Sequence, residues 1–304
     1  MTNQLKGTML TGLGVLILSP DAMLIRLMSA EPMTIVFWRG VGIFVMLSLM
    51  GMVRHRRGVL AYLRSAGPTG LLVSVCFAIC QLGFVGGVAT TNPAHVLVMV
   101  AATPLVAAIA SRILLGERIV PSTAIAIVAG LSGVAIMMSA HLGGGGQLSG
   151  DFIAAAVPIS LGLAFTLIRR LKVGDVWLLY AISGLIVAAV AAPFRGSEFL
   201  SGADILWAGI LVLIVVPVSF ALITQGPRYI TAAEVSLIML LETVLGPIWV
   251  WLVVGIAPTV HALIGGGILL ATLALHAWWR LSGARRARRL AQKSEALPLT
   301  SQSP

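Results

Sequence analysis

The sequence predicts an all-α membrane protein of ten transmembrane helices, arranged as two five-helix repeats of opposite orientation. Long apolar runs, the placement of Lys and Arg between them, and an internal repeat predict this fold. Hydrophobic residues make up 59% of the 304 residues and charged residues only 10%, against about 25% in soluble domains. Such a chain cannot cover its surface with polar groups, so its composition favours a lipid-facing surface.

Ten apolar runs are candidates to cross a bilayer, which takes about 20 residues per helix. The start of the chain resembles a signal peptide, with Lys6 before an apolar stretch, but Pro20, Asp21 and Arg26 interrupt the stretch and no clear cleavage site follows. We therefore expect a first membrane helix there. The ten runs are residues 6–28, 33–53, 67–88, 94–115, 120–140, 152–170, 176–193, 205–224, 233–254 and 259–279.

The basic residues indicate the orientation of these runs. If the chain starts in the cytoplasm and each run crosses once, all 20 Lys and Arg residues except Arg26, Arg39 and Arg195 fall on the cytoplasmic side. Because cytoplasmic loops of membrane proteins carry an excess of Lys and Arg, we expect an even number of spans and both termini in the cytoplasm. The net charge of +10 is thereby explained by topology, and no nucleic-acid partner is expected.

An internal repeat divides the runs into two halves. Residues 95–116 read HVLVMVAATPLVAAIASRILLG, and residues 234–255, offset by 139, read EVSLIMLLETVLGPIWVWLVVG. Five helices cross the membrane an odd number of times, so the second copy must be inverted. The turn after the first copy lies inside and keeps Glu117 and Arg118, whereas the turn after the second lies outside and carries no charge. The preference for Lys and Arg in cytoplasmic loops explains this difference.

The repeat and the charges together predict four parts of the chain. These are a first five-helix repeat at residues 1–142, a glycine-rich outside linker at 143–150, a second repeat at 151–279, and a basic cytoplasmic tail at 280–304. The tail is basic and then rich in Ser, Pro and Ala, which predicts a disordered segment that touches anionic lipid.

The sequence offers no sign of a cofactor, a metal site or catalysis. Cys76 and Cys80 lie one helical turn apart in an apolar run, but no second pair completes a metal site. No phosphate-binding loop is present, which disfavours an ATP-driven pump. No His/Glu or Ser/His/Asp arrangement suggests an enzyme.

Glu242 is the leading candidate for a functional side chain. It is near the middle of its run, flanked by Leu and Val residues. An ionised side chain there costs about 2.5–3.5 kcal/mol on insertion scales, so it normally faces a cavity or a partner. It is either a carboxylate that binds a proton or a substrate amine, or a structural carboxylate that caps broken backbone or pairs with an arginine.

Asp21 and Arg39 form a second candidate group. Each lies about seven residues from the outer end of its run, hence roughly 10 Å deep at 1.5 Å per residue, so an ion pair is geometrically possible. The pair would either orient the first two helices or act as an anion clamp or outer gate. Pro20 indicates a local break, where freed backbone groups can also bind ligand.

Four further polar or aromatic side chains complete the candidate substrate or proton site. The amides can line a cavity or bridge two helices. The indoles can stack on a flat substrate, although Trp is also common near membrane interfaces. These residues are Gln81, Gln225, Trp38 and Trp249.

Three motifs carry a family resemblance. They are the TPL…LLGE pattern that starts at Thr103, Phe37-Trp38-Arg39 in the second run, and GPRY followed by LETVLGP in the second half. They resemble the drug/metabolite transporter superfamily, specifically its EamA-type ten-helix members, over residues 7–279. Two departures, Ile256 in place of the second turn's Glu and Thr243 where many members carry Pro, warn against borrowing any one relative's substrate.

The resemblance implies a secondary transporter or facilitator of small metabolites, with ten helices around a central cavity and both termini in the cytoplasm. Inverted repeats of this kind support alternating access. We therefore expect an exporter of small metabolites such as amino acids in the bacterial inner membrane, with lipids around it and protons as the candidate coupling ion. Uptake or passive facilitation is the main alternative. A membrane enzyme or a scaffold is disfavoured, because neither catalytic side chains nor a soluble domain is found.

Overall fold

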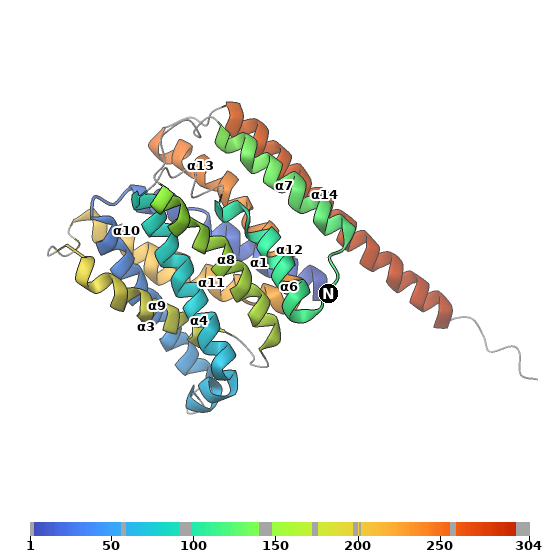
Figure 1. Ribbon diagram of the computed structural model, residues 1–304, viewed down its shortest axis with the longest axis horizontal. Coiled ribbons are helices and arrows are strands. Elements are labelled where there is room, and N and C mark those ends of the chain that lie inside the picture. The colour runs from blue at the N-terminus through green and yellow to red at the C-terminus, as the bar shows by residue number, and fades with distance from the viewer. Residues whose placement is uncertain are drawn as a thin grey trace, which may run out of the picture.

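All the regular structure described here is helical. The computed structural model describes residues 3–55, 59–90, 99–139, 148–171, 176–196, 200, 202–255 and 260–295. The helices, shown in Figure 1, are α1 Asn3–Leu18, α2 Asp21–Arg26, α3 Pro32–His55, α4 Val59–Thr90, α6 Thr103–Leu115, α7 Pro121–Ser139, α8 Leu148–Arg170, α9 Trp177–Ala191, α10 Ala203–Ile210, α11 Val216–Ile223, α12 Ala232–Met239, α13 Leu241–Val254 and α14 Val260–Glu295. The short elements η2 Ala192–Phe194 and η4 Gly226–Arg228 are 3-10 turns, and η3 Leu211–Val215 is a π-helical turn.

Seven helical stretches among these residues are long and apolar enough to cross a membrane. They are Asn3–Ile25, Pro32–Arg54, Ala61–Gly87, Phe152–Arg170, Trp177–Phe194, Ala203–Arg228 and Ala232–Val253. Three shorter apolar helices, Met99–Leu115, Pro121–Ile136 and Leu263–His276, overlap the fourth, fifth and tenth predicted runs. The predicted all-α membrane class is confirmed, and the count of ten crossings stays a prediction.

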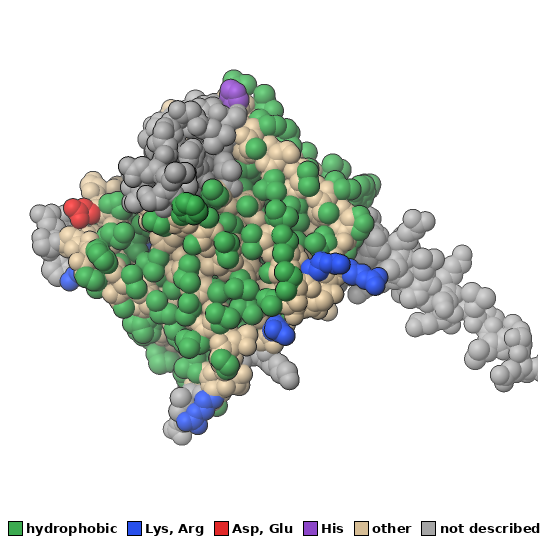
Figure 2. Space-filling model, in the orientation of Figure 1, with side chains coloured by type: hydrophobic (Ala, Val, Ile, Leu, Met, Phe, Trp, Pro, Cys, Tyr) green, Lys and Arg blue, Asp and Glu red, His purple; other side chains and the backbone are tan. Residues whose placement is uncertain are grey.

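The outer surface suits lipid. Large apolar side chains such as Ile113, Val128 and Leu252 are at least 66% exposed. Figure 2 shows a largely apolar face, with the Lys and Arg side chains that are visible in this view near its edges. Exposure on this scale would be costly in water, at about 25 cal/mol per Å². In a bilayer the same side chains meet hydrocarbon, so the helices need not bury them.

Small residues let the long helices approach closely. A Cβ added at Gly40 of α3 would lie 2.7 Å from the carbonyl oxygen of Gly184 on α9, and a Cβ at Gly184 would lie 2.7 Å from that of Gly40. α7 and α14 also lie side by side (Figure 1), and a Cβ at Gly133 would lie 2.9 Å from the Gly265 carbonyl oxygen. Glycine at such crossings is typical of membrane bundles, where packing drives helix association.

Two of the long apolar stretches are broken. α1 ends at Leu18 and α2 begins at Asp21, with Pro20 between them. α12 ends at Met239 and α13 begins at Leu241, after a turn at Leu240. Breaks of this kind occur inside membranes only where the freed backbone is buried in protein or lines a cavity. They therefore mark the interior of the bundle.

The tail prediction is wrong in part. We expected disorder from residue 280, but α14 continues as helix to Glu295. The segment ARRARRLAQK consists largely of strong helix formers, and these extend a helix that already exists. Residues 296–304, linker residues 143–147 and Ile256 lie outside the described residues.

We expect Gly40→Ala to destabilise the protein. The new methyl would meet backbone atoms of α9, and overpacking of this kind costs about 1–3 kcal/mol. Thermal unfolding in detergent measures the loss. Gly209→Ala is the matched control, because a Cβ there meets no atom within 4 Å. An unchanged melting temperature for Gly40→Ala would contradict the tight crossing.

Candidate functional site

The ion pair allowed by the depths of Asp21 and Arg39 is present. Both terminal nitrogens of Arg39 donate to the two carboxylate oxygens of Asp21, each at 2.7 Å. Asp21 is the first residue of α2, where a negative charge is favourable at a helix start. Two parallel bonds fix both groups in one plane. The pair therefore ties the break in the first span to α3.

Glu242 lies near this pair. It is the second residue of α13, directly after the turn at Leu240. Its carboxylate is close enough to Asp21 and Arg39 to interact electrostatically with both. Within the described part of the chain it has no ion-pair partner at 4 Å or less. Two carboxyl groups thus lie near one guanidinium, and Asp21 holds both of its terminal nitrogens.

Tyr180 is a member of this site that the sequence analysis did not select. Its ring stacks on Phe220, with centroids 4.4 Å apart, and stands edge-on to Phe77. Its hydroxyl is buried and has no hydrogen-bond partner among the described residues. The hydroxyl lies within electrostatic range of Arg39 and Glu242. From sequence, a tyrosine among apolar residues is expected to be a core residue or a membrane-interface residue. Only the tertiary contacts show that Tyr180 belongs to this site.

Gln81 bridges two helices, one of the alternatives raised from sequence. Its Nε2 donates to the Ser183 hydroxyl at 3.3 Å, which joins α4 to α9. Ser183 in turn donates to the carbonyl oxygen of Tyr180 at 2.7 Å. The Gln81 Oε1 is buried without a partner in the described structure. We call Asp21, Arg39, Glu242, Tyr180 and Gln81 the central cluster.

The two candidate tryptophans differ in their surroundings. The indole N–H of Trp249 donates to the Ser19 hydroxyl at 2.7 Å, which joins α13 to the break between α1 and α2. The indole nitrogen of Trp38 is buried and has no hydrogen-bond partner among the described residues. Its ring stands edge-on to Phe37. Trp249 thus positions the break, and Trp38 keeps a free donor.

Gln225 does not lie in the central cluster with the other candidate residues. It lies at a second polar site. It directly precedes η4, and its carbonyl oxygen accepts from the backbone N–H of Arg228 at 3.2 Å. The η4 turn is held by Arg169, the penultimate residue of α8. Arg169 Nη1 donates to the carbonyl oxygens of Pro227 at 2.9 Å and Ile230 at 2.6 Å.

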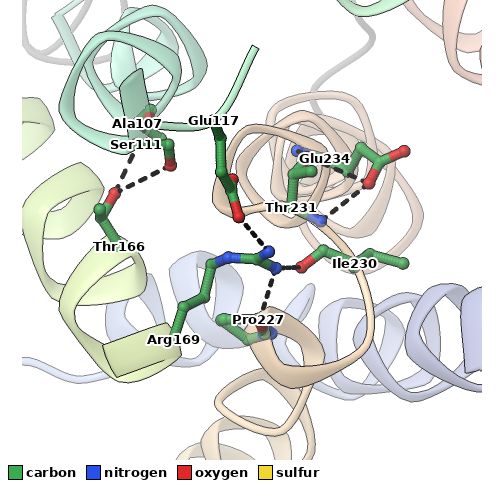
Figure 3. A network of polar contacts seen from close by, with 9 residues as sticks. All are labelled: Ala107, Ser111, Glu117, Thr166, Arg169, Pro227, Ile230, Thr231 and Glu234. Atoms are coloured by element: carbon green, nitrogen blue, oxygen red, sulfur yellow. Dashed lines mark hydrogen bonds and ion pairs between the residues drawn. The ribbon is translucent and has the colours of Figure 1, made fainter. Parts of the chain in front are cut away.

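Glu117 completes this second site, which we call the Arg169 network: Arg169, Glu117, Pro227 and Ile230. Figure 3 shows the Glu117 carboxylate accepting from Arg169 Nη2, while the two carbonyls take the other nitrogen. Glu117 follows α6, so the network joins α6, α8 and the turn before α12. The sequence analysis used Arg169 only as one of the basic residues that indicate orientation. Its role in this network could not be predicted, because its partners lie at least 52 residues away in the sequence.

A buried acid lies next to the Arg169 network, at the start of α12. Glu234 forms a capping box with Thr231 and accepts from Gln4 at 3.2 Å. His276 Nε2 lies 3.7 Å from its carboxylate. No group of three or more His, Cys, Asp or Glu that could hold a metal occurs within the residues described here.

Comparison with known proteins finds a family match in the first part of the chain. Residues 5–139 match the sequence model of the EamA-like transporter family, part of the drug/metabolite transporter superfamily. The match covers the first predicted repeat, a little under half of the chain. The resemblance inferred from sequence is thereby confirmed, and the family implies a multi-pass membrane transporter of small molecules.

Solved structures agree on the fold. One crystal structure is similar over 89% of this chain and 96% of its own, with a TM-score of 0.75 and 18% sequence identity. At this identity the likeness shows a shared fold and nothing of the substrate. No curated protein matches the chain.

Asp21→Asn should lower stability by about 3–5 kcal/mol, because removing one partner of a buried ion pair leaves the other charge uncompensated. Thermal unfolding in detergent is the measurement, extended to Arg39→Gln and the double variant. The double variant should lose less than the two single losses added together. Additive losses would show that the two side chains do not act as a pair.

Proposed function

We propose that this protein is a secondary transporter that exports small metabolites such as amino acids across the bacterial cytoplasmic membrane by alternating access. The central cluster carries the proposal. It holds both signs of charge and buried groups without partners, next to two broken helices. Charges of this kind inside a membrane mark substrate or ion pathways.

The chemistry of the central cluster suits a zwitterion. Glu242 can accept an ammonium group, and Arg39 can turn part of its fork towards a substrate carboxylate. The Tyr180 hydroxyl and the Gln81 amide oxygen add hydrogen-bonding groups that lack partners among the described residues. A bound ligand that satisfies these groups removes their desolvation cost, which favours binding of a polar substrate.

Protons are the proposed coupling ion. The central cluster has two carboxylates and one guanidinium, so its charge is more favourable once a proton or an ammonium group binds Glu242. Competition between the two for one carboxylate would make export of substrate and entry of protons mutually exclusive steps. This is the arrangement that exchange by alternating access requires.

Two features support ten crossings in two inverted repeats, 1–142 and 151–279. α6 and α13 each begin after a turn and end at a glycine in left-handed conformation, Gly116 with φ 67° and Gly255 with φ 79°. These glycines are 139 residues apart, the offset of the sequence repeat. α3 packs on α9 and α7 on α14, and each pair joins helices five crossings apart in the predicted order.

The same relation connects two further pairs of packed helices. α4 packs on α8, and α11 packs on α1. In the predicted order, a shift of α4 forward by five crossings gives α11, and a shift of α8 back by five crossings gives α1. A two-fold relation between the halves produces this exchange, and inverted halves of that kind support rocking between outward-open and inward-open states. In this orientation both termini and the Arg169 network lie on the cytoplasmic side.

Uptake or passive facilitation is the alternative, since the same central cluster would serve a substrate moving in either direction. Proteoliposomes distinguish these mechanisms when amino acids, nucleosides and cationic drugs are each tested with and without a pH gradient. Movement that follows the substrate gradient alone, unaffected by pH, would indicate facilitation. Failure of every substrate under every gradient would contradict transport.

Glu242→Gln should abolish transport while leaving the protein folded and in the membrane, because the amide cannot hold a proton or form an ion pair with an amine. Transport into proteoliposomes is the measurement, with thermal unfolding to confirm folding. Glu31→Gln is the matched control, since Glu31 is exposed at the start of α3. Unchanged transport by Glu242→Gln would remove Glu242 from the mechanism.

A further inference from the structure

An open pocket of about 430 Å³ lies beside the Arg169 network, at the end of the bundle where α6 and α8 stop. Two guanidinium groups, from Arg169 and Arg228, form part of its wall together with the Glu117 carboxylate and Tyr229. Lys6 contacts this wall, with its Nζ 4.8 Å from the centroid of the Tyr229 ring. The wall therefore carries two guanidinium groups and one carboxylate.

The charges of this pocket favour an anion. Two guanidinium groups face one carboxylate in its wall, and such an excess of one sign of charge raises the local concentration of ions of opposite sign. Arginine recognises carboxylate and phosphate through paired hydrogen bonds. Arg169 also has a spare donor, because its Nε is buried without an acceptor in the described structure.

The Glu117 carboxylate is placed so that another anion can replace it. Glu117 lies in the non-helical segment between α6 and α7, and its side chain is 29% exposed. Arg169 is held independently by the carbonyl oxygens of Pro227 and Ile230. The guanidinium would thus stay in place if Glu117 left, and an incoming anion would restore the charge balance.

We propose that this pocket binds an oxyanion group, a carboxylate or a phosphate, which competes with Glu117 for Arg169. The proposal rests on the proposed function in one respect: it makes the pocket the cytoplasmic mouth of the transport path. Exchange of the two anions breaks the bond between the segment after α6 and the end of α8.

A phosphorus NMR titration of the full-length protein with inorganic phosphate, in phosphatidylcholine nanodiscs, tests the proposal. We expect saturable binding to the wild type, weakened about tenfold or more by Arg228→Gln through loss of a charge-assisted hydrogen bond. Arg64→Gln is the matched control, since Arg64 is exposed on α4 and outside the pocket. Equal binding by wild type and Arg228→Gln, or no binding at all, would overturn the proposal.

Glu117→Gln tests the competition itself. Without the competing carboxylate, phosphate should bind more tightly than to the wild type, and acetate should displace it. Thermal unfolding establishes whether this variant is folded, and Glu117→Asp, with a shorter reach to Arg169, is the second variant and should also bind phosphate more tightly. Unchanged phosphate affinity in both variants would refute displacement of Glu117.

Nanodiscs that contain phosphatidylglycerol identify the source of the anion. If a lipid headgroup occupies the pocket, they should block phosphate binding to the wild type, whereas a free metabolite site should still bind phosphate there. Either result supports an oxyanion site. The titration needs no transport, so its failure leaves the export proposal intact, and inactive proteoliposomes leave the phosphate site intact.

Discussion

The bidentate ion pair between Asp21 and Arg39 is the interaction on which the rest of the interior depends. An arginine at this depth needs a partner, because an isolated charge in a bilayer costs several kcal/mol. Asp21 provides it only because Pro20 interrupts the first span and sets a new helix start there. The pair joins α2 to α3, and Trp249 joins the same break to α13. Glu242 is thereby held close to a charge that is already matched.

The sequence predicted the parts of this site that depend on depth and on helix length. Asp21, Arg39 and Glu242 stand out because ionisable residues in apolar runs are costly, and the depth of the first two allowed the pair that is observed. Tyr180 could not be found in this way, since its importance comes from a buried hydroxyl near α3 and α13. The Arg169 network joins residues at least 52 apart, and no periodicity encodes such a contact.

The two copies of the internal repeat end their helices in the same way. Gly116 and Gly255 both end their helices with positive φ, a conformation that glycine adopts without the steric cost of a Cβ. The two copies differ near the start of the helices that these glycines end, α6 and α13. Thr103 begins α6, whereas Glu242 stands at the equivalent position near the start of α13. One half thus contributes a neutral helix start and the other a charged one.

The Arg169 network and the central cluster are joined by one short rigid element. Arg169 holds the Ile230 carbonyl, Thr231 caps α12, and α12 runs for 8 residues to the turn before Glu242. That length is about 12 Å at 1.5 Å per residue. A capped helix of two turns moves as a unit, so a displacement of the η4 turn also displaces the backbone at Glu242. If anion binding at one end and cation binding at the other favour different positions of α12, each must alter the affinity of the other by the same factor.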